Sequence, residues 1–296
     1  MNCERIFLQS NEQYRNHILE VYDRAIEALV NCGISNDIID YRRGYITPRR
    51  PTAAHSDFLI NRQLGDWTET LLRASFNQQF EEFRAVKYGA GGNLIAGETG
   101  FTEMFEGYHN EIRTIGKRPD LLIYDHETIS RLSLSDDISE LEPSQLTGIA
   151  RMARRAMEVR SSRYLAAEYR RVKRQEQSFT PKLEDLPILA HWIVEHEVPC
   201  FYTQVFFDEV HTISFERILQ VIQETGDEYV KQVERNQRKY TFYIPVTEGI
   251  LIGQITEAPT WEAKIKSMND GRIIIYATPE GGRMELRKEL IQYLGI

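Results

Sequence analysis

The feature that most constrains the fold is a strongly apolar segment at residues 201–207, Phe-Tyr-Thr-Gln-Val-Phe-Phe. It shows no alternation of polar and apolar residues, which predicts a strand buried on both faces in the middle of a sheet. Residues 183–196 carry apolar side chains at helical spacing and end before Pro199, which predicts a helix. A strand, this helix and the buried strand together have the order of a right-handed crossover between parallel strands. We therefore expect an α/β (α+β mixed) fold with a central mixed sheet flanked by helices.

Two shorter strand-like segments each place a carboxylate beside basic residues. The first begins at Pro119-Asp120 and continues over residues 121–124, and the second contains Glu158 followed by Val159-Arg160. If the two strands lie side by side, both carboxylates meet at one edge of the sheet. Two oxygen ligands there suit a hard divalent ion such as Mg²⁺, and the arginines suit an anionic substrate. The pattern indicates a site that cleaves phosphodiesters.

Several other elements have recognisable sequence signals. Ser10 is the predicted N-cap of a helix over residues 10–31, and Asp66 is the predicted N-cap of a second helix that carries Glu69 one turn in. Residues 83–88 alternate like a strand. The glycine-rich residues 89–100 lack the ending of a phosphate-binding loop and predict a mobile loop or hairpin near the substrate, or a plain linker.

The remaining segments are assigned more coarsely. The polar stretch 126–145 is expected to be a connecting loop between the Asp120 strand and the region of Glu158, with at most one short helix. Residues 240–275, punctuated by glycine and proline, predict short β-strands in a small antiparallel module. Further helices are expected at residues 163–176, at 215–237 and from about residue 285.

The order of these elements over residues 64–210 resembles the PD-(D/E)xK nuclease superfamily, and within it a type II restriction endonuclease. The resemblance rests on Pro119-Asp120 and on the Glu158–Ser162 segment, with weaker support from the Gly65–Glu69 segment. It implies a restriction-endonuclease-like core and magnesium-dependent, sequence-specific hydrolysis of double-stranded DNA. A palindromic target would imply a twofold homodimer. A cognate DNA methyltransferase would be the functional counterpart in restriction-modification.

The resemblance also implies roles for individual residues. Asp120, Glu158 and the main-chain carbonyl of Val159 would hold Mg²⁺, and Glu69 would reach a second ion or an ordered water. The sequence departs from the family pattern at Arg160, where a lysine is usual. Arginine stays protonated and cannot act as a base, but it can stabilise charge on the phosphate. Lys182 is the other candidate for the missing ammonium group, and the sequence leaves open which of the two replaces the lysine.

Charge is distributed unevenly along the chain. The net charge of −8 argues against a nucleic-acid partner, but nine basic residues between Arg151 and Arg174 face only two acidic ones. Local field matters more than net charge for contact with phosphate. We therefore expect arginines of this stretch and of an irregular basic loop to contact the DNA backbone: Arg42, Arg43, Arg49, Arg50, Arg154, Arg155 and Arg163. Base readout is expected from the C-terminal module, for instance by Asn269, Arg272 or Arg283.

Each assignment has an ordinary structural alternative. Asp120 also suits a turn at the start of a strand, and Glu158 with Arg160 also suits a surface ion pair worth roughly 0–1 kcal/mol. Glu69 and Lys182 also suit solvated positions. Two other functions stay open: a PD-(D/E)xK nuclease of the repair or resolving type, and a non-catalytic DNA-binding protein.

Length and composition set the outer bounds. A chain of 296 residues with 42% hydrophobic residues can bury a full core. We expect three parts, at residues 1–60 (helices and basic loop), 61–237 (nuclease core) and 238–296 (β-rich module). There is no apolar run of membrane-spanning length and no signal-peptide pattern at the N-terminus. The three cysteines are far apart and form no disulfide framework, so we expect a cytoplasmic protein.

Overall fold

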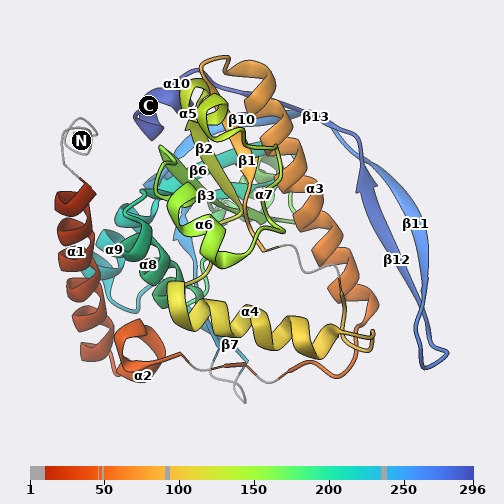
Figure 1. Cartoon of the computed structure of the whole chain (residues 1–296), viewed down its shortest axis with the longest axis horizontal. Helices are drawn as coiled ribbons and strands as arrows, with labels where there is room; N and C mark the ends of the chain where they lie inside the picture. The colour runs from red at the N-terminus through yellow and green to blue at the C-terminus, as the bar shows by residue number, and fades with distance from the viewer. Residues whose placement is uncertain (1–10, 46, 49, 91–93, 235–238) are drawn as a thin grey trace.

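The computed structural model describes residues 11–45, 47–48, 50–90, 94–234 and 239–296. Its centre is a seven-stranded sheet in the order β1-β2-β3-β5-β6-β10-β13 (Figure 1). Strands β3 and β5 are parallel, and the other neighbours are antiparallel, so the predicted mixed sheet is confirmed. The strands of this sheet are Phe83–Lys87 (β1), Leu121–Asp125 (β2), Arg155–Ser161 (β3), Cys200–Val205 (β5), Glu209–Ser214 (β6), Ile250–Glu257 (β10) and Arg283–Leu286 (β13).

Helices surround this sheet, and three small antiparallel pairs lie outside it. The helices are Asn11–Asn31 (α1), Asn36–Ile39 (α2), Ser56–Gln79 (α3), Phe101–Ile115 (α4), His126–Leu132 (α5), Pro143–Ala150 (α6), Ala166–Lys173 (α7), Asp185–His196 (α8), Phe215–Thr225 (α9) and Glu289–Leu294 (α10), with 3₁₀ turns at Tyr41–Arg43 and Val246–Glu248. The outlying strand pairs are Ser178–Phe179 with Ile244–Pro245 (β4, β9), Val230–Glu234 with Lys239–Phe242 (β7, β8) and Thr260–Ser267 with Ile273–Glu280 (β11, β12).

The buried strand that opened the sequence argument is β5. All six of its residues are buried, and it lies between β3 and β6. Its parallel partner β3 precedes it in the chain, with α7 and α8 in the connection. The prediction of a mid-sheet strand reached through a helical crossover from a parallel strand is confirmed.

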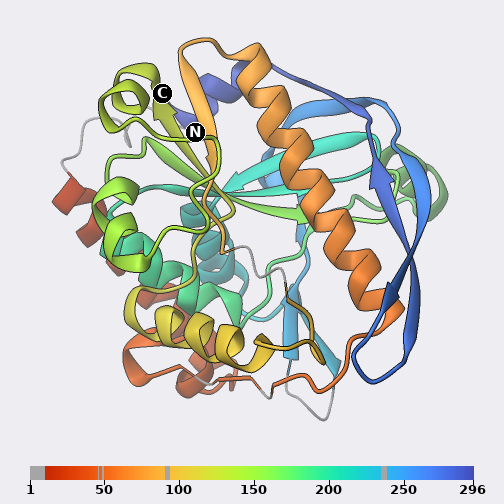
Figure 2. The ribbon, with the colours of Figure 1, turned by 45° about the vertical axis from the view of Figure 1, so that its right-hand side comes forward.

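Two hydrophobic clusters cover the two faces of the sheet. Side chains alternate along β2, so that Leu122 and Tyr124 face the cluster built with α1, α8 and α9, while Leu121 and Ile123 face the cluster built with α3 and α10. Figures 1 and 2 show α3 running along one side of the sheet. The sheet is therefore the middle layer between two helical layers.

Four predicted helices have boundaries that differ from the structure. Helix α3 begins at Ser56, ten residues before Asp66, because its apolar side chains from Leu59 onward pack against the protein and extend the helix. Helix α9 ends at Thr225, where Gly226 takes a positive φ of 60°, so the helix predicted over 215–237 gives way to β7. The predicted helix at 163–176 is confined to α7, and the last helix starts four residues later than predicted because Arg283–Leu286 pairs as β13.

Two further predictions were incomplete. The stretch 126–145 carries α5 and the start of α6, two helices where at most one was expected. The glycine-rich segment leads through turns into α4, which the sequence did not predict, and residues 91–93 of it lie outside the described part. Ser10, the predicted cap of α1, also lies outside the described residues, while α1 itself agrees with its prediction.

The C-terminal segment contributes to two structures. Strands β10 and β13 extend the central sheet, while β11 and β12 form a separate hairpin between them in sequence. Figures 1 and 2 show this hairpin standing beside α3 at the edge of the molecule. The predicted boundaries at residues 60/61 and 237/238 stay predictions.

Two smaller observations bear on the chain's class. Among the described helices, none has both the length and the apolar character needed to cross a membrane. The two cysteines in the described part, Cys32 and Cys200, are both free.

Candidate active site

The antiparallel pairing of β2 with β3 brings the two predicted carboxylates together. Leu121 pairs with Met157, so Asp120, one residue before β2, lies level with Glu158. Asp120 shares its side of the strand with Leu122, and Glu158 shares its side with Ala156, and both of these residues belong to the α8 side of the sheet. The main-chain N–H of Val159 donates to Oδ2 of Asp120 at 2.6 Å. The two acids therefore lie at one sheet edge and on one face.

A glycine fixes the main chain around Asp120. The N–H groups of Tyr88 and Gly89 both donate to the carbonyl oxygen of Asp120, at 2.9 and 3.0 Å. A Cβ at position 89 would lie 3.0 Å from the Cα of Asp120 and 3.2 Å from its Oδ1. Gly89 therefore lets the end of β1 approach Asp120 closely while its carboxylate stays uncovered on that side.

Two cations converge on one oxygen of Glu158, which is 1% exposed. Nζ of Lys117 contacts Oε1, and an Nη2 of Arg160 lies 2.9 Å from the same atom. Arg160 also donates to Oδ2 of Asp185, at the first turn of α8, at 2.5 Å. Lys117 and Arg160 are partly exposed, with 15% and 30% of their side chains accessible. They form the polar layer between the buried carboxylate and the surface.

The second oxygen of Glu158 has no hydrogen-bond partner among the described residues. A buried carboxylate oxygen without a partner is costly in a folded protein, which suggests that a ligand completes it. A small cavity of about 10 Å³ is lined by Glu158, Lys117, Arg160 and Asp185 together with apolar side chains of α8 and α9. Such a donor set, one free carboxylate oxygen beside a second carboxylate, fits a hard divalent cation.

The protein alone does not complete a metal site. In the described part of the chain, no group of three or more His, Cys, Asp and Glu side chains is arranged to hold an ion. This agrees with the chemistry of Mg²⁺, which commonly takes one or two carboxylates and fills its other positions with water and substrate phosphate. A fit by two carboxylates and one carbonyl is therefore reasonable for this ion.

Electrostatics distinguish the acids of this region. Burial and the neighbouring Glu158 raise the pKa of Asp120 to about 7. Burial and the charge of Asp120 raise the pKa of Glu69, on α3, to about 9. Burial alone would raise the pKa of Asp185 as well, but the charges of Arg160 and Lys117 outweigh it and lower that pKa. A crowded set of carboxyls whose pKa values are raised is typical of a place that awaits positive charge.

The sequence argument missed Lys117 as a member of this site. The lysine enters from the segment between α4 and β2, and its main-chain N–H donates to the carbonyl of Ile188 on α8 at 2.9 Å. Gly116 before it has a φ of 82°, and a Cβ there would lie 2.3 Å from the main-chain nitrogen of Trp192. Only glycine permits this approach, which holds Lys117 against α8. The one sequence signal was a Gly-Lys pair shortly before Pro119-Asp120.

The other predicted catalytic residues lie at different distances from the pair. Glu69 is half-buried on α3 and close enough for Asp120 and Glu158 to act on its pKa. Lys182 is exposed, its main chain forms an isolated bridge with Thr241, and its charge helps to lower the pKa of Asp185. Arg160 contacts Glu158 directly. Lys117 is thus the lysine that the fold brings into contact with Glu158.

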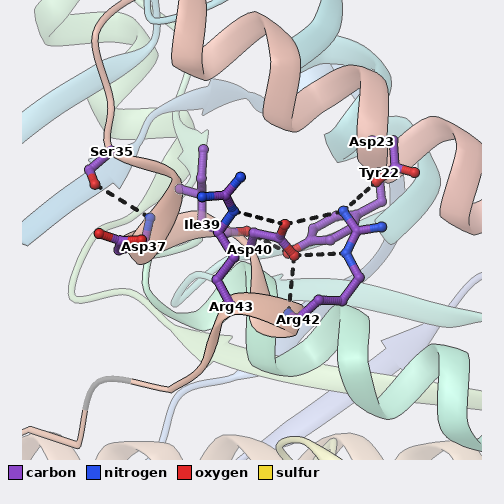
Figure 3. Close-up of polar contacts among 8 residues, drawn as sticks. All are labelled: Tyr22, Asp23, Ser35, Asp37, Ile39, Asp40, Arg42 and Arg43. Carbon is purple, nitrogen blue, oxygen red and sulfur yellow. Dashed lines mark hydrogen bonds and ion pairs between the residues drawn. The ribbon is translucent and has the colours of Figure 1, made fainter.

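The basic loop near the N-terminus is tied to acidic residues of its own region (Figure 3). Nε of Arg42 donates to Oδ1 of Asp40 at 2.8 Å, and its Nη2 donates to Asp23 at 2.5 Å. Arg43 lies 3.7 Å from the other oxygen of Asp40. Arg50 lies 4.0 Å from Glu106 on α4, and Arg49 lies outside the described residues.

The basic stretch after residue 150 is also paired within the chain. Arg154 contacts Asp125 at 2.7 Å, and Arg163 donates to Asn61 at 2.5 Å. Arg155 donates to the carbonyls of Leu294 and Gly295, and burial lowers its pKa to about 10. Contact with DNA stays a prediction for these arginines, and each would have to share or exchange its partner.

The residues expected to read bases lie in or beside the hairpin segment. Asn269 donates to Thr99 at 3.3 Å, and Arg272 pairs with Asp270 at 2.6 Å. Arg283 at the start of β13 lies 3.3 Å from Glu285. Their role in base readout stays a prediction.

Comparison with known proteins gives one match. A family model described as AccI restriction endonuclease matches residues 19–172 and 170–296, which together span nearly the whole chain. Neither the search of curated proteins nor the search of solved structures returned a match.

Proposed function

Because the chain belongs to the AccI restriction endonuclease family, it is a type II restriction enzyme that cleaves DNA, and we propose that Asp120 and Glu158 form its active centre. The observation that carries the proposal is the buried carboxylate of Glu158. It lies level with Asp120, one of its oxygens has no partner among the described residues, and two cations contact the other. An ordinary surface ion pair between Glu158 and Arg160 would not leave a buried oxygen uncompensated.

The residues present fit Mg²⁺ as the cofactor. Asp120, Glu158 and the carbonyl of Val159 would hold it, with Glu69 as a further carboxylate nearby. When bound, the ion makes a hydroxide nucleophile available at neutral pH and offsets charge on the phosphate, so the protein needs no separate base. It would also lower the pKa values of Asp120 and Glu69, which are raised without it.

The cations around Glu158 have two different tasks in this proposal. Lys117, an ammonium group held by Gly116 and α8, takes the role of the lysine that the family pattern places where Arg160 stands. It would bind the scissile phosphate and orient the attacking water. Arg160 stays anchored to Asp185 and would stabilise negative charge that develops on the phosphate. Lys182, exposed beside Asp185, would add to the positive field.

The arrangement around the DNA follows from the same premise. A duplex has two strands and each chain supplies one pair of carboxylates, so a palindromic target calls for a twofold homodimer. Arg43, Arg50 and Arg163 are exposed and would contact the DNA backbone. A methyltransferase of the same specificity would protect the host DNA.

Cleavage of phage DNA in the presence of Mg²⁺, followed by sequencing of the fragment ends, tests the proposal. Discrete fragments with one common end sequence are expected, and chelation should stop the reaction. A smear of fragments, or cutting at branched structures alone, would contradict sequence-specific cleavage.

Assignment of the centre needs a readout apart from activity. Calorimetry with Ca²⁺, which binds oxygen ligands without supporting most such reactions, should show binding to the wild type and much weaker binding to Glu158→Gln. Glu195→Gln is a matched control, because Glu195 pairs with Arg151 and lies in the last turn of α8, whereas Asp185 of the site lies in its first turn. Equal Ca²⁺ binding by wild type and Glu158→Gln would remove Glu158 from the centre.

A further inference from the structure

The outer face of the β11–β12 hairpin is apolar and exposed. Trp261, Ile265, Ile273 and Ile275 share one face of the hairpin by its register, and their exposed fractions run from 49% to 70%. The opposite face packs on α3, where Ile274 is buried with Leu59. Apart from Trp261 at its base, the apolar side chains of this face are 62% to 70% exposed, so the described part of the chain leaves them largely uncovered.

The apolar surface continues beyond the hairpin. The ring of Trp261 lies 6.0 Å from that of Phe207, and the N–H of Phe207 donates to the carbonyl of Tyr164. Tyr164 and the next residue, Leu165, are exposed at 56% and 50%. Six of the ten large apolar side chains that are exposed in the described part of the chain belong to this surface, which we name the hairpin face. It consists of Tyr164, Leu165, Trp261, Ile265, Ile273 and Ile275.

We propose that the hairpin face is the surface through which two copies of this chain form the homodimer. From their exposed fractions of 49% to 70%, the six side chains expose on the order of 600 Å², compared with the ~800 Å² that each partner buries in a typical stable interface. A patch of this size is at the upper end of what single folded chains leave open to water, and such patches often mark interaction surfaces. In a twofold dimer the same patch lies on both sides of the interface, and an apolar patch can meet its own copy without opposing like charges.

Charge distinguishes this occupant from DNA. The lysines of the hairpin lie on its other face, where Lys264 contacts Glu262 and Glu280, and Lys266 contacts Glu98. The six side chains of the hairpin face carry no charge that would attract phosphate. A second copy, which meets the face with the same apolar residues, is the better complement.

The inference rests on the proposed twofold homodimer and names the surface that forms it. Sedimentation of the metal-free full-length protein without DNA, over a range of concentrations, tests it. The wild type should have twice the chain mass of 34.6 kDa. Ile265→Glu with Ile275→Glu, which pair directly across the hairpin, should weaken dimerisation at least about 100-fold, because four carboxylates would be buried at the interface.

Controls separate this inference from the proposed active centre. Met152→Glu adds one carboxylate at an exposed apolar position away from the hairpin and should stay dimeric. Circular dichroism and thermal melting establish that each variant is folded, and Ile273→Glu replaces the double variant if that one unfolds. Ca²⁺ binding should be unchanged in the monomeric variant.

The contrary outcomes are distinct. If the double variant is still a dimer, the hairpin face is not the dimer interface, but the proposal of a homodimer stands. A monomeric wild type would overturn both. A monomeric wild type whose salt-dependent DNA binding is lost in the double variant would assign the face to DNA.

Discussion

Glu158 and Asp40 are both buried carboxylates that each meet two cations, yet they serve different ends. Asp40 uses both of its oxygens, toward Arg42 and Arg43 two and three residues away, and it also accepts the main-chain N–H of Arg42 (Figure 3). Glu158 uses only one oxygen among the described residues, and one of its cations, Lys117, comes from the segment between α4 and β2, 41 residues earlier in the chain. In the first arrangement, both oxygens of Asp40 find partners within three residues of it, and these contacts stabilise a turn. The second is assembled over long range and is left incomplete, which is what a binding site requires.

The largest expected effect comes from Glu158→Gln. Loss of one metal-binding carboxylate should lower the cleavage rate by about 1,000-fold or more, equivalent to about 4 kcal/mol of transition-state stabilisation. Asp40→Asn should change the rate less than about threefold, because this carboxylate faces only its own turn. Single-turnover cleavage of a labelled duplex measures both. Equal losses in the two variants would erase the distinction between the two sites.

Lys117→Met should come next, with a rate lower by about 100-fold, because the ammonium group would contact the phosphate directly. Lys117→Arg keeps the charge and should recover part of the rate. Lys182→Met, at an exposed lysine, should lose less than about tenfold. If Lys182→Met were the more damaging change, the role would return to Lys182, one of the two candidates that the sequence left open.

Asp120→Asn should alter the dependence of stability on pH. The pKa of Asp120 is raised to about 7 in the folded protein, so its favourable contribution to folding is complete below the ordinary pKa near 4 and is lost as the pH rises through 7. In metal-free buffer the wild type should lose stability between pH 5 and 8, and the variant should lose about 1–3 kcal/mol less. Urea unfolding at several pH values measures this difference. Added Ca²⁺ should restore the wild type at pH 8 but not the variant.

The smallest expected effect is that of Asp40→Ala on folding. Removing a mostly buried carboxylate leaves Arg42 and Arg43 without that partner, and the free energy of unfolding should fall by about 1–2 kcal/mol. The slope of urea unfolding should be unchanged. A drop in DNA affinity larger than the drop in stability would instead indicate that the loop itself contacts the duplex.

The sequence predicted what depends on local patterns. Asp120 and Glu158 stand at short β-prone runs, and β5 was marked by its apolar residues, so the sequence predicted these three strands, while the pairing of the first two was only an assumption. Lys117 could not be found in this way, because its place is set by Gly116 meeting α8 more than 70 residues later. The same limit affected the basic stretch, since Asp125, which pairs with Arg154, and Glu209, which pairs with Arg170, lie 29 and 39 residues away.

The hairpin shows the complementary limit. Its residues read as short strands, and they are, but the sequence does not tell which face of a two-stranded ribbon is covered. The covered face is the one that packs on α3, and the sequence predicted the start of this helix at Asp66, whereas it begins at Ser56. The ten additional residues are those that carry Leu59 against Ile274.

Helix α3 has a geometric consequence for the way such an enzyme would cut. Leu59 of this helix packs with Ile274 of the hairpin, and Glu69 lies close enough to Asp120 and Glu158 for their charges to act on its pKa. The two positions are about 15 Å apart along the helix axis. In a pair of chains joined through their hairpins, the span between the two cleavage points would thus be set by a stiff spacer and the angle at the joint. The number of base pairs between the cuts in the two strands would then be determined by the length of α3 and by the angle between the two hairpins, and would not depend on the flexibility of the loops.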